Sequence, residues 1–320
     1  MAVTTDDVLW CYRYVLRREP ESEEILKFHA SSINDFRSLV WRFINSQEFQ
    51  QQKRQVPSMV PLDALAMEVE LDVPATQLAL LRDRIRDAWT HLGELRPLHS
   101  VLTGYEFLPE NVDENATARF WATGMAEAVS IAAWLRKYGV EDTEAKTCVE
   151  YGCGMGRVSF GLAKMFLNVH AYDISLAHLE LAKRRALEIG AANISFHLCS
   201  DNAIVHPLEK CDFFYSRIVF QHNPPPLIRE LIAAALKSLR PSGIAIFQVP
   251  TYGSGYRFKI KDYLANSSKL DMEMHCIPQA EVFSLIAAAR CRVLEVREDG
   301  SIGWLGQWVS NSFVVQRPLK

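Results

Sequence analysis

The sequence predicts an α/β fold, in which a doubly wound, mostly parallel sheet of seven strands follows a small all-α unit. Three observations predict it. A glycine-rich turn at residues 148–157 joins a short apolar run to an apolar helix, as where a parallel strand enters its helix. Short apolar runs and helical patterns then alternate along the chain. Two final runs, 292–296 and 312–316, can pair antiparallel and complete the sheet.

The expected strands follow one another in order. The last two parallel ones are continuous apolar runs rich in β-branched and aromatic residues, as expected for strands buried on both faces. Between them, leucine, isoleucine and alanine recur at helical spacing from Leu227 to Leu239, and the segment 241–243 predicts a turn into the next strand. After the strand that opens the glycine turn, the predicted parallel strands are 169–173, 193–198, 212–220 and 243–250.

Residues 1–55 form a separate all-α unit by composition. Residues 5–7 can cap a first helix, Ser22 can begin a second, and Asn34 can cap a third. Because three short helices bury little apolar surface on their own, we expect this unit to pack on something else.

Residues 56–117 are predicted to be a linker and a helical extension that lies over the active site. A helix is expected over 76–92, with apolar residues on one face and Gly93 at its end. Residues 118–320 form the main domain, which carries an insertion at about 251–277. A connection of this length is typical of a lid or binding loop.

Composition excludes several classes of protein. The net charge is −3 over 320 residues and no basic stripe appears, which argues against a nucleic-acid partner. The seven cysteines form no CxxC pair, which is typical of free cysteines in a reducing compartment. The nine histidines are too scattered for a metal site. No apolar run reaches membrane-spanning length. The sequence therefore predicts a cytoplasmic protein with no metal and no membrane span.

The glycine turn predicts a nucleoside site. Gly152, Gly154 and Gly156 can adopt positive φ and let a ligand lie against the main chain, beside a helix start with partial positive charge. Asp173 ends the next strand, where a ribose presents its hydroxyls. A dinucleotide site would need glycine in place of Arg157, and a P-loop would need Lys followed by Ser or Thr.

Glu150, the three glycines and Asp173 together resemble motif I and its successor in class I S-adenosylmethionine-dependent methyltransferases, whose sheet is Rossmann-like. The resemblance covers about residues 118–318, is nearest to bacterial members of unassigned substrate, and implies S-adenosylmethionine as the cofactor, with S-adenosylhomocysteine as the product. By position Asp201 inherits the contact to the adenine amino group, unless it only caps a short turn. The expected cofactor-binding residues are Glu150, Tyr151, Gly152, Cys153, Gly154, Gly156, Arg157, Asp173, Ile174, Asp201, Asn202 and Gln221.

Polar residues after the fourth strand and in the insertion predict the acceptor site, because open α/β sheets bind ligands at the carboxyl ends of their strands. His222 can take a hydroxyl proton as general base, and the alternative is a structural histidine. For the insertion, the alternative is a flap whose aromatic residues only pack onto the core. The expected substrate-binding residues are Asn223, Tyr252, Tyr256, Glu273 and His275.

The expected reaction is an in-line methyl transfer that depends on alignment and exclusion of water. The stretches 16–20 and 45–49 resemble a small helical module of bacterial surface and glycan-related proteins, so residues 1–55 are expected to dock a partner or to mediate homo-oligomerisation. With His222, this favours O-methylation of a saccharide or related small molecule. A protein or nucleic-acid methyltransferase and a catalytically silent cofactor-binding scaffold remain as alternatives, although residues 223–226 lack the aromatic of the amino-methylating signature.

Overall fold

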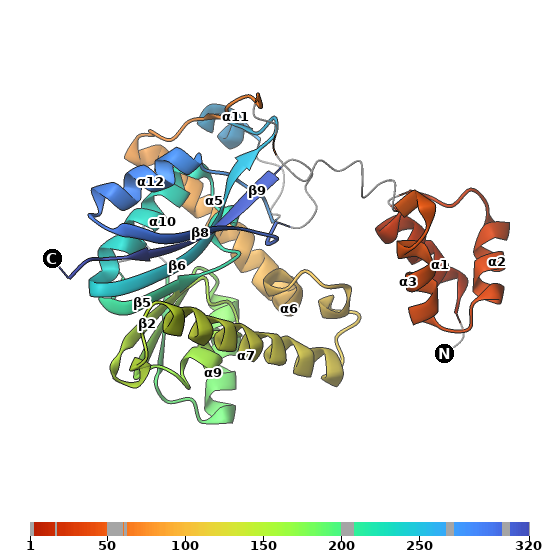
Figure 1. Cartoon of the computed structure of the whole chain (residues 1–320), viewed down its shortest axis with the longest axis horizontal. Helices are drawn as coiled ribbons and strands as arrows, with labels where there is room; N and C mark the ends of the chain where they lie inside the picture. The colour runs from red at the N-terminus through yellow and green to blue at the C-terminus, as the bar shows by residue number, and fades with distance from the viewer. Residues whose placement is uncertain are drawn as a thin grey trace. The chain divides into compact units, whose positions relative to one another are not determined.

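The computed structural model divides into two compact units, Met1–Pro61 and Leu62–Lys320. The residues it describes are 3–16, 18–49, 60, 63–199, 208–266, 272–302 and 308–319 (Figure 1).

Short helices around a small apolar core make up the first unit. They are α1 (Thr5–Trp10), which continues into a π-helical turn (Cys11–Val15), α2 (Glu23–Ser32) and α3 (Phe36–Ile44). Thr4 and Asp7 form a capping box at the start of α1. Asp35, rather than the expected Asn34, caps α3, because its carboxylate accepts the Ser38 N–H at 2.9 Å. Val8, Cys11 and Leu39 are fully buried in the core.

The second unit contains a seven-stranded sheet in the order β4-β3-β2-β5-β6-β9-β8. Neighbours from β4 to β6 pair in parallel, and β9 pairs antiparallel with both β6 and β8. The prediction of a doubly wound, mostly parallel α/β sheet is confirmed. The strands are β2 (Thr147–Tyr151), β3 (Asn168–Asp173), β4 (Ile194–Leu198), β5 (Cys211–Ser216), β6 (Leu239–Gly253), β8 (Arg292–Asp299) and β9 (Trp308–Gln316).

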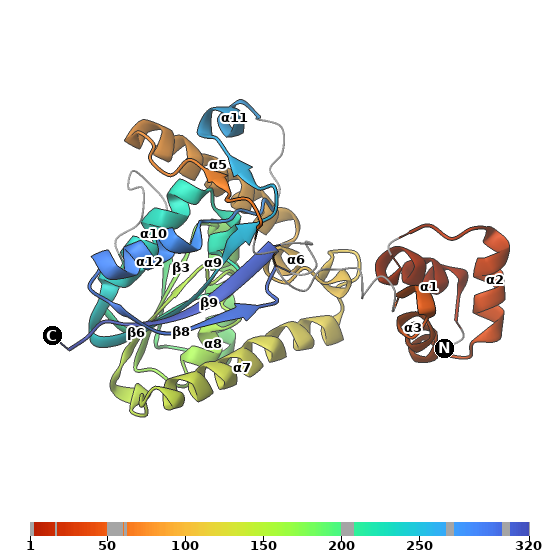
Figure 2. The same ribbon diagram turned by 45° about the horizontal axis from the view of Figure 1, so that its top comes forward.

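Helices cover both faces of this sheet. Helices α7 and α8 lie on one face and α10 and α12 on the other (Figure 2). Residues of α7 and α8 pack with Phe213 and Ile244, whereas residues of α10 and α12 pack with the adjacent Phe214 and Ala245. A short parallel pair, β1 (Glu68–Val69) and β7 (Arg257–Phe258), lies outside the main sheet. The helices are α5 (Ala75–Leu95), α6 (Pro97–Val101), α7 (Glu114–Lys137), α8 (Ser159–Leu162), α9 (Leu176–Ile189), α10 (Pro225–Ser238), α11 (Ile260–Ala265) and α12 (Gln279–Ala288), with single 3₁₀ turns at Tyr105–Phe107, Thr143–Ala145 and Phe220–His222.

Three local predictions of the second unit differ from the structure. The strand expected over 212–220 ends at Ser216, and a 3₁₀ turn occupies Phe220–His222. Helix α5 does not end at Gly93 but continues to Leu95. The glycine serves close packing instead, since a Cβ there would lie 2.4 Å from the Ser175 hydroxyl oxygen. The segment 241–243, expected as a turn, lies within the long strand β6, and the turn-like geometry remains only as a φ of 65° at Ser242.

Within the described ranges, no helix combines the length and the apolar character that a membrane crossing requires.

Candidate active site

Strand β2 ends in a loop whose path depends on glycine. The φ angles are +78° at Gly152 and +52° at Gly154, in the left-handed region that side chains disfavour. A Cβ at Gly152 would lie 2.2 Å from Val219 Cγ2, and one at Gly154 would lie 2.8 Å from Val101 Cγ2. The loop is therefore held closely between the segment after β5 and helix α6.

Asp173, at the end of β3, fixes this loop from below. Its Oδ2 accepts the Gly154 N–H at 2.7 Å, and its Oδ1 accepts the Ser175 N–H at 2.8 Å. Each carboxylate oxygen keeps a further lone pair. The side chain is thus held in one orientation and can still accept hydrogen bonds from a ligand's hydroxyls.

Glu150 is a buried carboxyl beneath the same loop. The Ser159 hydroxyl donates to its Oε2 at 2.5 Å. Burial raises the pKa of Glu150 to about 8, and the hydrogen bond from Ser159 only partly opposes this. A cation placed against Glu150 would favour its ionised form.

These groups line one cavity, called here the first cavity, which Trp89 of α5 and Val101 of α6 bound on another side. The helical extension before the main sheet therefore contributes to the wall of the cavity. The predicted cofactor-binding residues that line it are Glu150, Tyr151, Gly152, Cys153, Gly154, Arg157, Asp173 and Ile174.

Of the four other predicted cofactor-binding residues, the two that the structure describes, Gly156 and Gln221, do not line this cavity. Gly156 (φ +81°) faces the core, since a Cβ there would lie 3.1 Å from the Phe160 ring. Gln221 is buried and bonded to other side chains. Asp201 and Asn202 lie outside the described residues.

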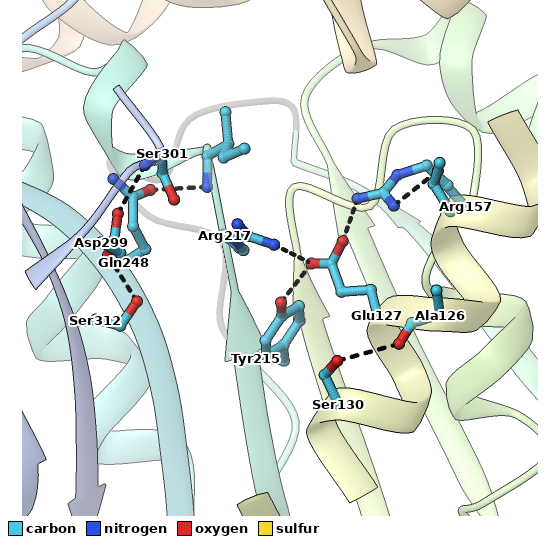
Figure 3. A network of polar contacts seen from close by, with 12 residues as sticks. Ala126, Glu127, Ser130, Arg157, Tyr215, Arg217, Gln248, Asp299, Ser301 and Ser312 are labelled. Carbon is cyan, nitrogen blue, oxygen red and sulfur yellow. Dashed lines mark hydrogen bonds and ion pairs between the residues drawn. The ribbon is translucent and has the colours of Figure 1, made fainter. Parts of the chain in front are cut away.

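Sequence reasoning missed a charged cluster at the edge of the first cavity, shown in Figure 3. Glu127 of α7 pairs with Arg157 at 2.6 Å and with Arg217 at 3.7 Å, and it accepts a hydrogen bond from the Tyr215 hydroxyl. Burial alone would raise the pKa of Glu127, but these three partners lower it below its usual value. Glu127 is therefore an ionised carboxylate. In the part of the chain that the structure describes, no group of three His, Cys, Asp or Glu side chains is placed to hold a metal ion.

A second cavity of about 630 Å³ adjoins the first, a volume typical of small-molecule sites. Helix α7, the end of β5, and strands β6, β8 and β9 form its walls. Five residues line both cavities: Glu127, Arg157, Tyr215, Arg217 and Ile218.

Ile218 is strained at this junction. Its φ of 57° is unusual for a β-branched side chain and costs on the order of 1–3 kcal/mol. The Ile218 N–H donates to Gln248 Oε1 at 2.9 Å, and Gln248 Nε2 donates in turn to Gln221 Oε1 at 2.9 Å and to Ser310 Oγ at 2.7 Å. Gln221 therefore supports the wall of the site from behind.

His222, predicted as a general base, lines neither cavity. Its Nδ1 lies 2.8 Å from the Glu273 carbonyl oxygen, and its Nε2 lies 3.3 Å from Gln221 Nε2. Burial lowers the pKa of His222 to about 4. The ring is neutral at physiological pH and both its nitrogens are engaged, which favours the structural alternative.

The predicted substrate-binding residues of the insertion contact one another instead of a cavity. The Tyr256 hydroxyl lies 2.8 Å from His275 Nδ1, and Glu273 pairs with Arg84 of α5 at 2.6 Å. The insertion is thus tied to α5 by its own polar side chains, as in the alternative of a packed flap. Asn223 differs from them because it lines the first cavity. The predicted substrate-binding residues that line neither cavity are Tyr252, Tyr256, Glu273 and His275.

Comparisons with known proteins agree with this geometry. Residues 148–243 match the family model described as "Methyltransferase domain". Two curated proteins named "Ubiquinone biosynthesis O-methyltransferase" are similar. The one from Hydrogenovibrio crunogenus is 29% identical over 43% of this chain and 54% of its own length. The one from Colwellia psychrerythraea is 24% identical over 61% of this chain and 69% of its own length. The chain therefore spans about half the length of the first of these relatives.

Among solved structures, magnesium protoporphyrin IX methyltransferase from Synechocystis PCC 6803, with bound S-adenosylhomocysteine, has a similar fold. The TM-score is 0.51, the sequences are 18% identical, and the match covers 74% of this chain and 99% of that one.

Proposed function

We propose that this protein methylates an oxygen atom of a small molecule through a class I S-adenosylmethionine-dependent methyltransferase domain, in keeping with the match of residues 148–243 to a methyltransferase domain model. S-adenosylmethionine is the cofactor of this domain. The observation that carries the proposal is the first cavity, where a glycine loop and two carboxylates meet and a second cavity opens beside them. The names of both curated relatives support oxygen as the accepting atom.

Three residues of the first cavity fit parts of the cofactor. Asp173 would accept the ribose hydroxyls with its remaining lone pairs. Glu150 would face the positively charged end. Arg157 would hold the carboxylate, since its buried Nε has no hydrogen-bond partner within the described ranges.

The chain's own contribution to the reaction is alignment and exclusion of water. When bound, S-adenosylmethionine would supply the methyl group from its sulfonium: the new carbon–oxygen bond would replace the carbon–sulfur bond, whose electron pair would stay on sulfur, and the hydroxyl proton would pass to solvent. Trp89 and Val101 cover the first cavity, and the strained Ile218 stands where the two cavities join. Fixing both reactants at such a junction converts a two-body encounter into an oriented transfer.

Two classes of acceptor are proposed. The first is a saccharide, which follows from the resemblance of the N-terminal unit to a module of glycan-related proteins. The N-terminal unit itself is proposed to dock a partner or a second copy of the chain. Exposed aromatic side chains on it, Tyr14 and Trp41, are compatible with docking. The names of the curated relatives add an acceptor from ubiquinone biosynthesis.

Release of S-adenosylhomocysteine across a panel of saccharides, nucleotide sugars and phenols tests the proposal. We expect turnover with at least one small molecule, and less than about a 10-fold loss of kcat in His222→Gln, because removal of a general base typically costs about 10²- to 10⁴-fold. The variant is expected to melt at a lower temperature, since a buried hydrogen-bonded ring is lost.

Two outcomes would count against this scheme. If calorimetry showed binding of NAD and none of S-adenosylmethionine, the proposed function would be wrong. If folded His222→Gln lost one limb of the pH–rate profile, His222 would be restored as the base.

Affinity for S-adenosylmethionine is expected to rise with pH through Glu150. With a pKa of about 8, the carboxyl is mostly protonated at pH 6, and the ionised form is the one that attracts a cation. Proton linkage then predicts about a 20-fold gain in affinity between pH 6 and pH 7.5, measured by calorimetry. Glu150→Gln should flatten this dependence, whereas Glu144→Gln, which changes an exposed acid, should retain it. If the affinity of the wild type did not change with pH, Glu150 would not contact the positively charged end of the cofactor.

A further inference from the structure

We propose that the second cavity binds the methyl acceptor through an acidic group of that molecule, a carboxylate or a phosphate, which Arg217 holds. The inference rests on the proposed function, because it places the acceptor beside the methyl donor.

The position of Arg217 is the first argument. It directly follows β5, at the carboxyl end of a central parallel strand, where open α/β sheets bind their ligands. Its side chain lines both cavities, as do Glu127 and Ile218. A molecule held by Arg217 would therefore lie against residues that also line the first cavity.

Arg217 is also incompletely paired. Arg157 and the Tyr215 hydroxyl already contact the Glu127 carboxylate closely, and the Arg217 nitrogen lies 3.7 Å from it, beyond hydrogen-bond distance (Figure 3). The Arg217 side chain is 44% exposed. A guanidinium has five N–H donors in a planar fork, which matches the two oxygens of a carboxylate or phosphate.

Two other charged groups of the second cavity have closer partners. Arg297 pairs with Glu295. Asp299 accepts the Ser301 N–H at 3.0 Å and the Ser312 hydroxyl at 2.7 Å. Because three arginines and three acids line this cavity, its net charge does not select an anion. Selection has to come from the local position of Arg217.

The rest of the wall suits the body of a small molecule. Ile131 and Trp134 of α7 and Ile246 of β6 line the second cavity with apolar surface. Small-molecule sites combine such surface with a few placed polar groups. The acceptor we infer has an apolar body and one acidic substituent.

The test measures binding of matched acid and neutral probes to protein saturated with S-adenosylhomocysteine. The carboxylate pair is 3,4-dihydroxybenzoate and 3,4-dihydroxybenzamide, and the phosphate pair is phenyl phosphate and phenol. The variants are Arg217→Gln, Arg217→Lys and, as control, Arg292→Gln. Arg292 is an exposed arginine of β8 that bonds to Gln316 and lines neither cavity.

We expect the acid of at least one pair to bind about 10- to 100-fold more tightly than its neutral partner. Arg217→Gln should abolish this preference, Arg217→Lys should keep part of it, and Arg292→Gln should leave it unchanged. The pair that shows the preference identifies carboxylate or phosphate as the anion.

The inference is overturned if the preference survives in Arg217→Gln, if acid and neutral probes bind equally, or if no acid binds at millimolar concentration. In these cases S-adenosylhomocysteine still binds and the proposed function stands. Failure of the wild type to bind S-adenosylhomocysteine would instead remove the proposed function, and this inference with it.

Discussion

Asp173→Asn is expected to weaken binding of S-adenosylmethionine by about 100-fold or more. The carboxylate accepts main-chain N–H groups from Gly154 and Ser175, and its remaining lone pairs are proposed to accept two ribose hydroxyls. An amide has one oxygen, so its NH₂ group would face an N–H donor or a hydroxyl. Loss of two hydrogen bonds to a charged acceptor costs about 3 kcal/mol or more, which corresponds to this change in Kd.

Calorimetric titration measures the effect, and thermal melting without ligand separates it from loss of the fold. Asp142→Asn, at an exposed acid of the same unit, serves as the matched control and should bind like the wild type. If Asp173→Asn bound within about threefold of the wild type while Asp142→Asn behaved normally, the ribose would have to lie elsewhere.

Gly124→Ala is expected to destabilise the protein and to weaken cofactor binding together. A Cβ at Gly124 of α7 would lie 1.9 Å from the Arg157 carbonyl oxygen, a main-chain atom that cannot rotate away. Helix α7 would have to move off the glycine loop, and the Glu127–Arg157 ion pair would move with it. Overpacking of this kind costs about 1–3 kcal/mol, and we expect at least about a 10-fold loss of affinity for S-adenosylmethionine.

Val129→Ala is the control for this substitution, because Val129 is exposed on the same helix. Its stability should stay within about 0.5 kcal/mol of the wild type. A Gly124→Ala protein with normal melting and normal affinity would contradict the close contact between α7 and the loop.

The sheet and the glycine loop could be predicted from the sequence because their signals are local. Strand periodicity, the positive φ of Gly152 and the position of Asp173 each depend on a few neighbouring residues. The same holds for the alternation of strands and helices, which determines that parallel strands end at one edge of the sheet.

The charged cluster could not be predicted in the same way, because Glu127 and Tyr215 are 88 positions apart and meet only in the folded chain. One signal was present. Glu127 lies between Gly124 and Ala128 on α7. The side chain of Ala128 is buried and packs against Gly161 of α8. A carboxylate beside that buried face of a helix is costly without a partner.

For the insertion, the sequence predicted a binding loop that the structure does not favour. Its aromatic and polar residues have the composition of a binding loop, but Glu273, His275 and Tyr256 satisfy one another and Arg84. Composition cannot distinguish side chains that await a ligand from side chains that already have partners.

Different parts of the chain line the two cavities, so the two sites can change independently during evolution. The groups proposed to hold the methyl donor come from the β2–β3 region, whereas β8 and β9, the last strands of the chain, contribute to the second cavity and not to the first. With the acceptor in the second cavity, as proposed, mutations at residues 297–299 or at Ser312 would alter which molecule is accepted while the donor site keeps its sequence. New acceptors are accessible through the C-terminal hairpin, which makes it the first segment to randomise in a directed search for altered specificity.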